Sequence, residues 1–179
     1  GIEHASFTTA DTLTVCGLSD GGWVKQIDLA SSVVTDLLTG HGFTSAEPIA
    51  NTQHIAASIR GRSGGNFAFR FTVPNGKYKR LDLGAPVSLS PSNDRILINR
   101  PTLQEADIVH ASNCEVIGSV PAPDGRRVVS HRWSNHPDYV VSTSKDFGNN
   151  IFIHHLPSNR AIQATKTADT NFPDLWINQ

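Results

Sequence analysis

Four short apolar runs recur along the chain at a nearly constant interval. They are Leu13-Thr14-Val15, Ile55-Ala56-Ala57, Ile96-Leu97-Ile98 and Tyr139-Val140-Val141, and successive runs begin 42, 41 and 43 residues apart. Glycine, proline, asparagine and aspartate lie around the runs. Short apolar runs with such boundaries are typical of buried middle strands. The pattern therefore predicts a repeated structural unit of about 42 residues.

Each apolar run belongs to a longer pattern of four strand-like segments. One segment precedes the run, a polar or glycine-rich break follows it, and two further segments joined by a tight turn complete the unit. Asparagine, glycine, proline and serine fit these turns through their backbone preferences. The predicted first strands are 5–8, 47–51, 86–90 and 128–133, the third strands 23–29, 67–73, 107–111 and 151–156, and the outer strands 33–38, 78–83, 116–120 and 160–165.

Four strands at this period predict an all-β protein of β-propeller-like architecture, because propeller blades have four strands in about 40–45 residues. We expect about four antiparallel blades in a single domain over 1–179, with less than about a tenth helix. The repeats span roughly 3–40, 44–84, 85–121 and 126–167, and 171–177 is predicted as one extra strand. This count favours part of a larger propeller, with a closed four-bladed ring as the alternative.

Two segments resemble a known family. Leu89-Ser90-Pro91-Ser92-Asn93-Asp94-Arg95 is similar to the Ser-Pro-Asp-Gly hairpin of the WD-like repeats in TolB-type propellers, and Trp133 to Asp138 is similar with an altered turn. Asn150-Ile151-Phe152-Ile153 resembles the Asn-Ile-Tyr strand of that family. The resemblance implies a repeat protein that serves as a binding scaffold, sometimes beside a catalytic domain. It also implies a periplasmic or secreted protein.

Charge and hydropathy exclude two classes of partner. The chain has 179 residues with 15 basic and 16 acidic side chains, a formal net charge of -1. Binding of nucleic acid or an anionic membrane needs a net basic field. No run of about 18 apolar residues could span a membrane. The chain has no methionine and opens at Gly1, so we expect a processed form or a piece of a longer protein.

Metal and cofactor motifs are absent from the sequence. Cys16 and Cys114 form no Cys-x-x-Cys pair, and we interpret them as free thiols, with a disulfide or metal pair as the alternative. His154 and His155 are consecutive on a predicted strand, so their side chains should point to opposite faces. We interpret them as structural or surface histidines. The sequence predicts no cofactor.

Candidate site residues follow from the propeller geometry. In a propeller, the loop after the second strand and the loop after the outer strand lie on one face, and the first strand lines the channel. His131 and Arg132 then lie on a channel-side strand, where either could bind a carboxylate or act in acid–base catalysis. The residues predicted on the loop face are His41, Arg62, Arg100, Asp124, Lys145 and Asp146. The alternative interpretation of this face is a solvated rim of loops.

The sequence therefore predicts a non-catalytic binding or assembly module of propeller type from a larger exported protein. The partner would be another chain or a second copy that completes the propeller. A locally basic repeat from Arg60 to Arg80 could also face an anionic glycan. One alternative is a propeller-type polysaccharide lyase or hydrolase that uses His131, Arg132 and Arg100. Another is a non-catalytic segment of a larger redox or modifying enzyme.

Overall fold

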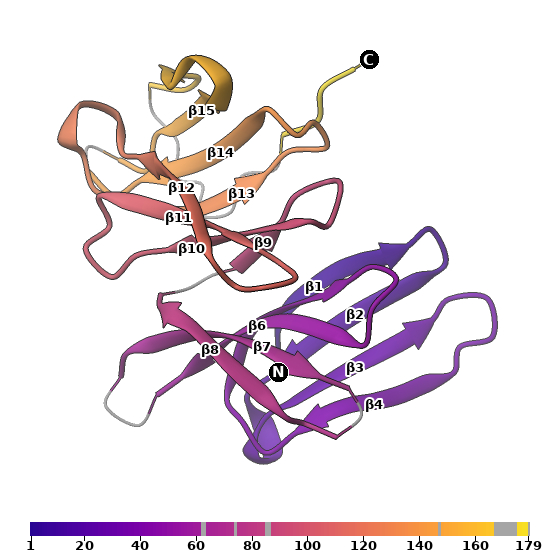
Figure 1. Ribbon diagram of the computed structural model, residues 1–179. Helices are drawn as coiled ribbons and strands as arrows, with labels where there is room; N and C mark the ends of the chain where they lie inside the picture. The colour runs from indigo at the N-terminus through magenta and orange to yellow at the C-terminus, as the bar shows by residue number, and fades with distance from the viewer. Residues whose placement is uncertain (62–63, 74, 85–86, 147, 167–174, 179) are drawn as a thin grey trace. The chain divides into compact units, whose positions relative to one another are not determined.

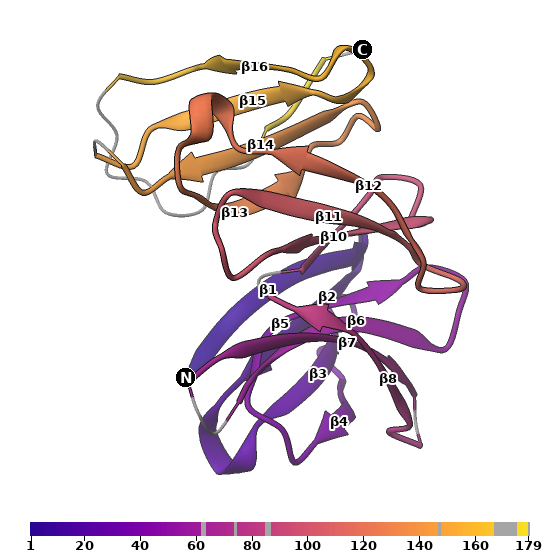
Figure 2. The same ribbon diagram turned by 60° about the vertical axis from the view of Figure 1, so that its left-hand side comes forward.

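The computed structural model describes residues 1–61, 64–73, 75–84, 87–146, 148–166 and 175–178. The chain divides into two compact units, Gly1–Val87 and Ser88–Gln179. Each unit contains two four-stranded antiparallel sheets, whose strands are labelled in Figures 1 and 2. We call these sheets blades and number them in chain order.

The first unit holds the first and second blades. Sequence order and spatial order agree in both, so each blade is a simple meander. The strands of the first blade are β1 (Ile2–Thr9), β2 (Thr12–Gly17), β3 (Trp23–Asp28) and β4 (Val34–Thr39). Those of the second blade are β5 (Phe43–Ile49), β6 (His54–Arg60), β7 (Asn66–Thr72) and β8 (Tyr78–Leu83).

The second unit holds the third and fourth blades, again as meanders. The strands of the third blade are β9 (Val87–Leu89), β10 (Arg95–Asn99), β11 (Glu105–His110) and β12 (Val116–Pro121). Those of the fourth blade are β13 (Val128–Trp133), β14 (Tyr139–Ser144), β15 (Ile151–His155) and β16 (Arg160–Gln163).

The predicted all-β class with four four-stranded antiparallel blades is confirmed. Each strand predicted for the four blades overlaps an observed one, and the largest difference is β5, which begins at Phe43 rather than at Glu47. In the described part of the chain, helix is confined to three single 3-10 turns, Ser19–Gly21, Pro123–Gly125 and Leu156–Ser158. The low helix content is therefore confirmed as well.

The hairpin between β9 and β10 shows how a short motif fixes local structure. The Asn93 amide donates to the Ser90 carbonyl at 2.8 Å, and Asn93 has a φ of 59°. Asparagine tolerates this left-handed conformation better than most residues. The Ser90 hydroxyl donates to Asp94 at 2.9 Å and accepts from the Arg95 amide at 3.1 Å. The turn is thus closed by its own side chains.

The loops after the second and outer strands meet at the same end of each unit, as the propeller geometry predicts. In the first unit, the Gly40 amide donates to the Gly22 carbonyl at 3.0 Å. A Cβ at Gly22 would lie 1.6 Å from the His41 carbonyl oxygen, and its φ is +85°, so only glycine fits there. In the second unit, the Val128 amide donates to the Leu103 carbonyl at 2.7 Å.

The two units have different cores between their blades. In the first unit the apolar core between the blades comprises Cys16, Val24, Leu38, Phe43, Ala46, Ile55, Ala57 and Phe71. In the second unit it includes Leu97, Ala106, Ile108, Val120, Trp133 and Val140. The second set is smaller, and polar residues lie beside it.

The predicted extra strand, 171–177, falls largely outside the described residues. Residues 175–178 carry no strand assignment, and Trp176 is exposed. The backbone of Ile177 is held by the side chain of Asn135, which accepts from its amide at 2.7 Å and donates to its carbonyl at 2.9 Å. The extra strand stays a prediction.

Candidate functional site

Strand register allows the second and fourth blades to be compared residue by residue. Ile55 and Val140 both belong to the core between blades, and each lies in a middle strand. Side chains directly opposite each other on adjacent strands share a face of the sheet. The row Ile55–Phe71–Tyr78 of the second blade therefore corresponds to Val140–His154–Ala161 of the fourth. In the same way, Ala57–Phe69–Arg80 corresponds to Ser142–Phe152–Gln163.

The remaining correspondences follow from the same registers. Asn99–Ala106–Val120 in the third blade matches Cys16–Val24–Leu38 in the first, because both rows end just before the next blade begins. His131 lies between the paired positions Val129–Thr143 and Arg132–Val141, and so stands opposite Ser142 as Ala46 stands opposite Ala57.

Four polar residues thus occupy core positions that are apolar in the first unit. Asn99, His131, Ser142 and His154 stand where the first unit has Cys16, Ala46, Ala57 and Phe71. All four are buried, and His131 is 0% exposed. We call them the buried polar quartet. Burying polar groups costs free energy unless they are hydrogen-bonded, so this replacement needs compensation.

Hydrogen bonds within the quartet supply part of that compensation. The Asn99 side-chain oxygen accepts from the His131 amide at 3.0 Å and from His131 Nδ1 at 2.5 Å. His154 Nε2 lies 2.7 Å from the Ser142 hydroxyl. The two imidazole rings are neighbours, with centroids 5.6 Å apart and planes tilted by 45°. The quartet is therefore one connected cluster between the third and fourth blades.

Both imidazoles are neutral at pH 7. Burial, with a smaller effect from neighbouring His154, lowers the pKa of His131 to about 3. Burial lowers the pKa of His154 to about 4. Because the Asn99 oxygen can only accept, the proton of His131 lies on Nδ1 and leaves a lone pair on Nε2. That Nε2 atom is buried and has no hydrogen-bond partner among the described residues.

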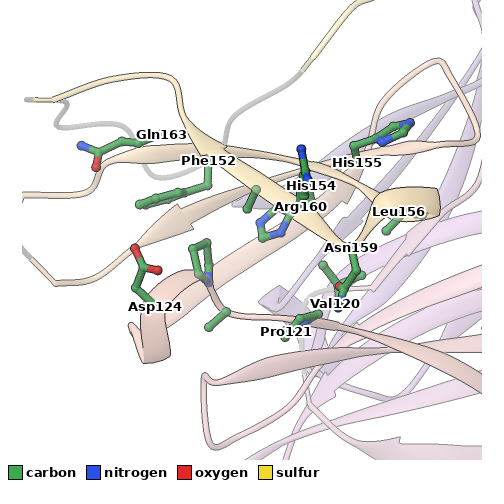
Figure 3. A pocket seen from close by; sticks show the side chains of 13 residues that line it. Val120, Pro121, Asp124, Phe152, His154, His155, Leu156, Asn159, Arg160 and Gln163 are labelled. Carbon is green, nitrogen blue, oxygen red and sulfur yellow. The ribbon is translucent and has the colours of Figure 1, made fainter.

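A cavity of about 300 Å³ opens beside the quartet, between β12 with its following turn and β15–β16. His154 contributes to its lining, and Figure 3 shows the imidazole pointing into the space between the two walls. Ala161 and His154 stand where the second blade has the larger residues Tyr78 and Phe71. The first unit has a cavity of about 320 Å³ at the matched place, and there Phe71 contributes to the lining instead of a histidine. We call the cavity beside the quartet the His154 pocket.

The remaining lining of the His154 pocket is mixed. Asp124 and Arg160 are exposed residues of opposite charge, one on each wall. Asn159 has an amide side chain, and Pro121 and Pro123 present apolar ring surfaces. The charges of Asp124 and Arg160 offset each other, and the buried His154 imidazole is neutral at pH 7. A site of this composition suits an uncharged polar molecule better than an anion.

The residues predicted at a catalytic channel have other contacts in the structure. Arg100 forms ion pairs with Glu105 and Asp107; its Nε donates to one Asp107 oxygen at 2.8 Å, and its Nη2 lies 2.7 Å from the other. His131 belongs to the buried polar quartet. Arg132 is half-buried on β13 and pairs with Val141 across the sheet, next to His131 in sequence. Their catalytic roles stay predictions.

His41, Lys145 and Asp146 lie in the loops where the sequence predicts them. His41 is half-buried, with its ring centroid 5.6 Å from that of Phe71 and 6.1 Å from that of Tyr78. Asp146 accepts from the Arg127 amide at 2.6 Å, and the Lys145 amide donates to the Arg127 carbonyl at 2.8 Å. Arg62 lies outside the described residues. Their binding roles also stay predictions.

Cysteine chemistry contributes nothing to the site. Cys16 and Cys114 are both free, and burial raises the pKa of the Cys16 thiol to about 12, which keeps it protonated. Among the described residues, no group of three or more histidine, cysteine, aspartate or glutamate side chains is placed to hold a metal ion.

Sequence reasoning identified only one member of the quartet, His131. It treated His154 as structural or exposed and did not single out Asn99 or Ser142. The predicted opposite orientation of His154 and His155 agrees with their contacts, because His155 Nδ1 lies 2.8 Å from the Ser158 hydroxyl rather than in the quartet. The signal that could have found the quartet is a register alignment of the four repeats, with polar residues at positions that are apolar elsewhere.

Comparison with known proteins supports the fold. No family model and no curated protein matches the chain. Among solved structures, it is similar to TolB from Acinetobacter baumannii, with 10% identity and a TM-score of 0.66 over 90% of this chain and 43% of that one. It is also similar to hydrazine synthase from Kuenenia stuttgartiensis, with 14% identity and a TM-score of 0.66 over 90% of this chain and 48% of that one. This chain spans less than half the length of either.

At these identities the likeness shows the fold alone, and it confirms the predicted resemblance to TolB-type β-propellers at that level. In the part of the chain that the structure describes, no helix is long and apolar enough to cross a membrane.

Proposed function

We propose that the chain is a non-catalytic binding module of propeller type, and that the His154 pocket takes a small uncharged polar molecule. One observation carries this proposal. A buried polar residue, His154, lines this pocket at the position where the first unit has Phe71. A repeat that only had to pack would retain the apolar core of the first unit, because buried polar groups destabilise unless they are satisfied.

The geometry of the pocket supports this kind of ligand. The neutral His154 imidazole can offer a hydrogen bond from the pocket floor without attracting an anion, and Asn159 adds an amide at the wall. A cavity of about 300 Å³ lies at the small end of ligand sites. A monosaccharide with hydroxyl and amide groups matches this size and polarity.

Filling the pocket should abolish binding. Ala161→Tyr places in the fourth blade the residue that the second blade has at this position. We expect N-acetylglucosamine to cause saturable nitrogen–proton shift changes at residues 120–124 and 156–161 in the parent chain. In Ala161→Tyr the affinity should fall more than about tenfold, since ring volume replaces ligand volume.

The matched control is Ile162→Tyr, because Ile162 is the next residue along β16 and is exposed. It should bind like the parent. Glucuronate, an anionic sugar of similar size, should bind more weakly than N-acetylglucosamine. Shift changes that lie elsewhere, or that persist in Ala161→Tyr, would show that the pocket is not the ligand site.

Assembly with another chain is a second function that a separate observation favours. Phe7, Leu13, Ile27 and Val34 are paired across all four strands of the first blade and form one apolar row. Residues of opposite parity, such as Cys16 and Val24, pack toward the second blade. The row therefore lies on the other face of the sheet, where Phe7 is 71% exposed. Such a face fits another blade, supplied by a second copy or another chain.

Polar substitution of Phe7, the most exposed of these residues, tests the assembly. We expect Phe7→Ser to lower the sedimentation mass of the chain at concentrations where the parent self-associates, with an unchanged melting temperature. Val116→Ser is the control, because Val116 is an exposed apolar residue of an outer strand. A parent chain that sediments as a monomer at every concentration would exclude a second copy as the partner.

The remaining predictions, on the partner, the location and the enzyme alternatives, have fewer observations in their support. An anionic glycan at the basic repeat and a periplasmic or extracellular location are retained as proposals. The lyase or hydrolase alternative has weaker support, because Arg100 is engaged with Asp107 and the His131 ring is buried. The second alternative, a non-catalytic segment of a larger enzyme, is compatible with the likeness to a hydrazine synthase chain.

A further inference from the structure

The buried polar quartet places two imidazoles side by side in surroundings that disfavour their protonation. His131 Nδ1 already donates to Asn99, so an added proton would sit on Nε2, which faces no acceptor among the described residues. His154 Nε2 is engaged with Ser142, and its ring lies 5.6 Å from that of His131. Two protonated rings at this separation would repel each other in a dry interface.

In the part of the chain that the structure describes, neither imidazole forms an ion pair with a carboxylate. Asn99 of β10 and Ser142 of β14 are uncharged partners. Asp107 of β11 is engaged by Arg100, while its neighbours in sequence, Ala106 and Ile108, face the core. Described charged or titratable groups of the surrounding elements are Arg95 over the Trp133 ring, Arg126 over the Phe152 ring, Glu105 paired with Arg100, Arg132 on β13, and Asp124, His155 and Arg160 at the pocket.

The first unit provides an internal comparison. The four matched positions there are Cys16, Ala46, Ala57 and Phe71, and none of them gains charge in mild acid. A histidine lies in the first interface as well, but the Glu47 carboxylate of the second blade is 3.9 Å from His4 Nε2 and would offset its charge. Acid should therefore weaken the interface of the second unit much more than that of the first.

We propose that protonation of His131 and His154 opens the interface between the third and fourth blades, and that this opening releases the ligand of the His154 pocket in mild acid. The release rests on the proposed function, whereas the opening of the interface does not. The interface between the third and fourth blades would thus act as a pH-dependent conformational switch.

The direction and size of the response follow from linkage. In the closed interface both histidines have a pKa lowered far below the ordinary value of about 6.5. As the pH falls below 6.5, the open form therefore binds protons while the closed form stays unprotonated. Stability of the closed form is thus complete above pH 6.5 and is lost as the pH falls. Between pH 7 and pH 5 the opening equilibrium should rise about 20-fold for each histidine, or a few hundred-fold for both.

Amide hydrogen exchange of the ligand-free chain at pH 7 and pH 5 tests the opening. After correction for the intrinsic dependence of exchange on pH, amides of β13 to β15 should lose protection by about a hundred-fold or more. Amides of β5 to β7 should change much less. Equal loss of protection in both units, or no loss in either, would overturn the proposal.

Transplanting the apolar core identifies the groups responsible. A variant with Asn99→Cys, His131→Ala, Ser142→Ala and His154→Phe carries the first unit's residues at all four positions, and its exchange at β13 to β15 should no longer depend on acid. If this variant does not fold, His154→Phe alone should remove the contribution of that histidine, about 20-fold. His155→Phe is the control and should keep the full response.

Ligand release is measured separately, by titrating N-acetylglucosamine into the parent and into His154→Phe at both pH values. If exchange responds to acid but the sugar does not bind at pH 7, the proposed ligand of the His154 pocket is wrong, whereas the acid-dependent opening of the interface is supported. Binding at pH 7 that persists at pH 5 would refute the coupling between them.

Discussion

Replacing Arg100 by methionine should destabilise the second unit by about 3 kcal/mol, because the buried carboxylate of Asp107 in the third blade would lose its charged partner. The Asp107 side chain is 1% exposed, and both of its oxygens face the Arg100 guanidinium, at 2.8 Å and 2.7 Å. Removing one member of such a pair leaves a desolvated charge without a partner, which costs more than the pair contributes. Native-state hydrogen exchange of β10 and β11 should report the loss.

The double variant Arg100→Met with Asp107→Leu separates this explanation from a loss of packing. With the carboxylate gone, most of the stability should return, since well-packed apolar residues can replace a buried ion pair at little cost. Glu105→Gln is the milder comparison, because Glu105 is more exposed and contacts the same guanidinium. A double variant no more stable than Arg100→Met would show that the guanidinium stem, and not the charge, supports the blade.

This prediction bears on the enzyme alternative. Arg100 was a candidate for substrate binding because of its place in a loop at the predicted functional face. A guanidinium that is paired with a buried carboxylate has little freedom to bind a substrate anion as well. If the double variant regains stability, the main role of Arg100 is structural.

The repeat predicted the fold because strand position in a propeller is set by local pattern. Buried middle strands such as Ile96-Leu97-Ile98 are apolar runs of fixed spacing, and turns such as Asn75-Gly76 mark the last hairpin of each blade. Neither signal requires knowledge of distant contacts. Strand order then follows from chain order, since every blade is a meander.

The site was harder to predict from the sequence than the fold, because it depends on strand register and on a bulge in β13. Asn99 and His131 are 32 residues apart in sequence, so only the pairing of blades brings them together. Ser130 has a φ of 56° and interrupts the register of β13 between Val129 and Arg132. Alternation along 128–133 therefore cannot assign His131 to a face, because a bulge shifts every side chain beyond it.

His154 was not selected as a site residue for a related reason. Two consecutive histidines on a strand are correctly placed on opposite faces by alternation, but alternation does not say which of them is buried. The deciding fact is that Val140, a core residue, pairs with His154 across the sheet. That information lies in the register of β14 against β15 and not in the local sequence.

The reverse transplant should have a large effect in the first unit. Phe71 is fully buried in the apolar core between the first two blades, at the position matched by His154. Phe71→His would remove ring contacts with Phe43 and Phe69, whose centroids lie 5.6 Å and 5.8 Å away, and would bury an imidazole without a partner. We expect a loss of about 3–4 kcal/mol in the free energy of unfolding, measured by native-state exchange of β5 to β7.

Adding Ala57→Ser tests whether the quartet is a transferable unit. Ala57 matches Ser142, the partner of His154, so a serine there can reach the new imidazole. Ala57→Ser alone should cost about 1 kcal/mol, because its hydroxyl would be buried without a partner. The double variant should be about 1 kcal/mol more stable than the sum of the two single changes, through one hydrogen bond between neutral groups.

The double variant should also make the stability of the first unit fall between pH 7 and pH 5. A histidine that is buried in its neutral form destabilises the folded state as the pH drops below the ordinary pKa of the side chain. A double variant with no favourable coupling and no new acid sensitivity would show that matched strand register is insufficient, and that the second unit holds its imidazoles through contacts outside the four matched positions.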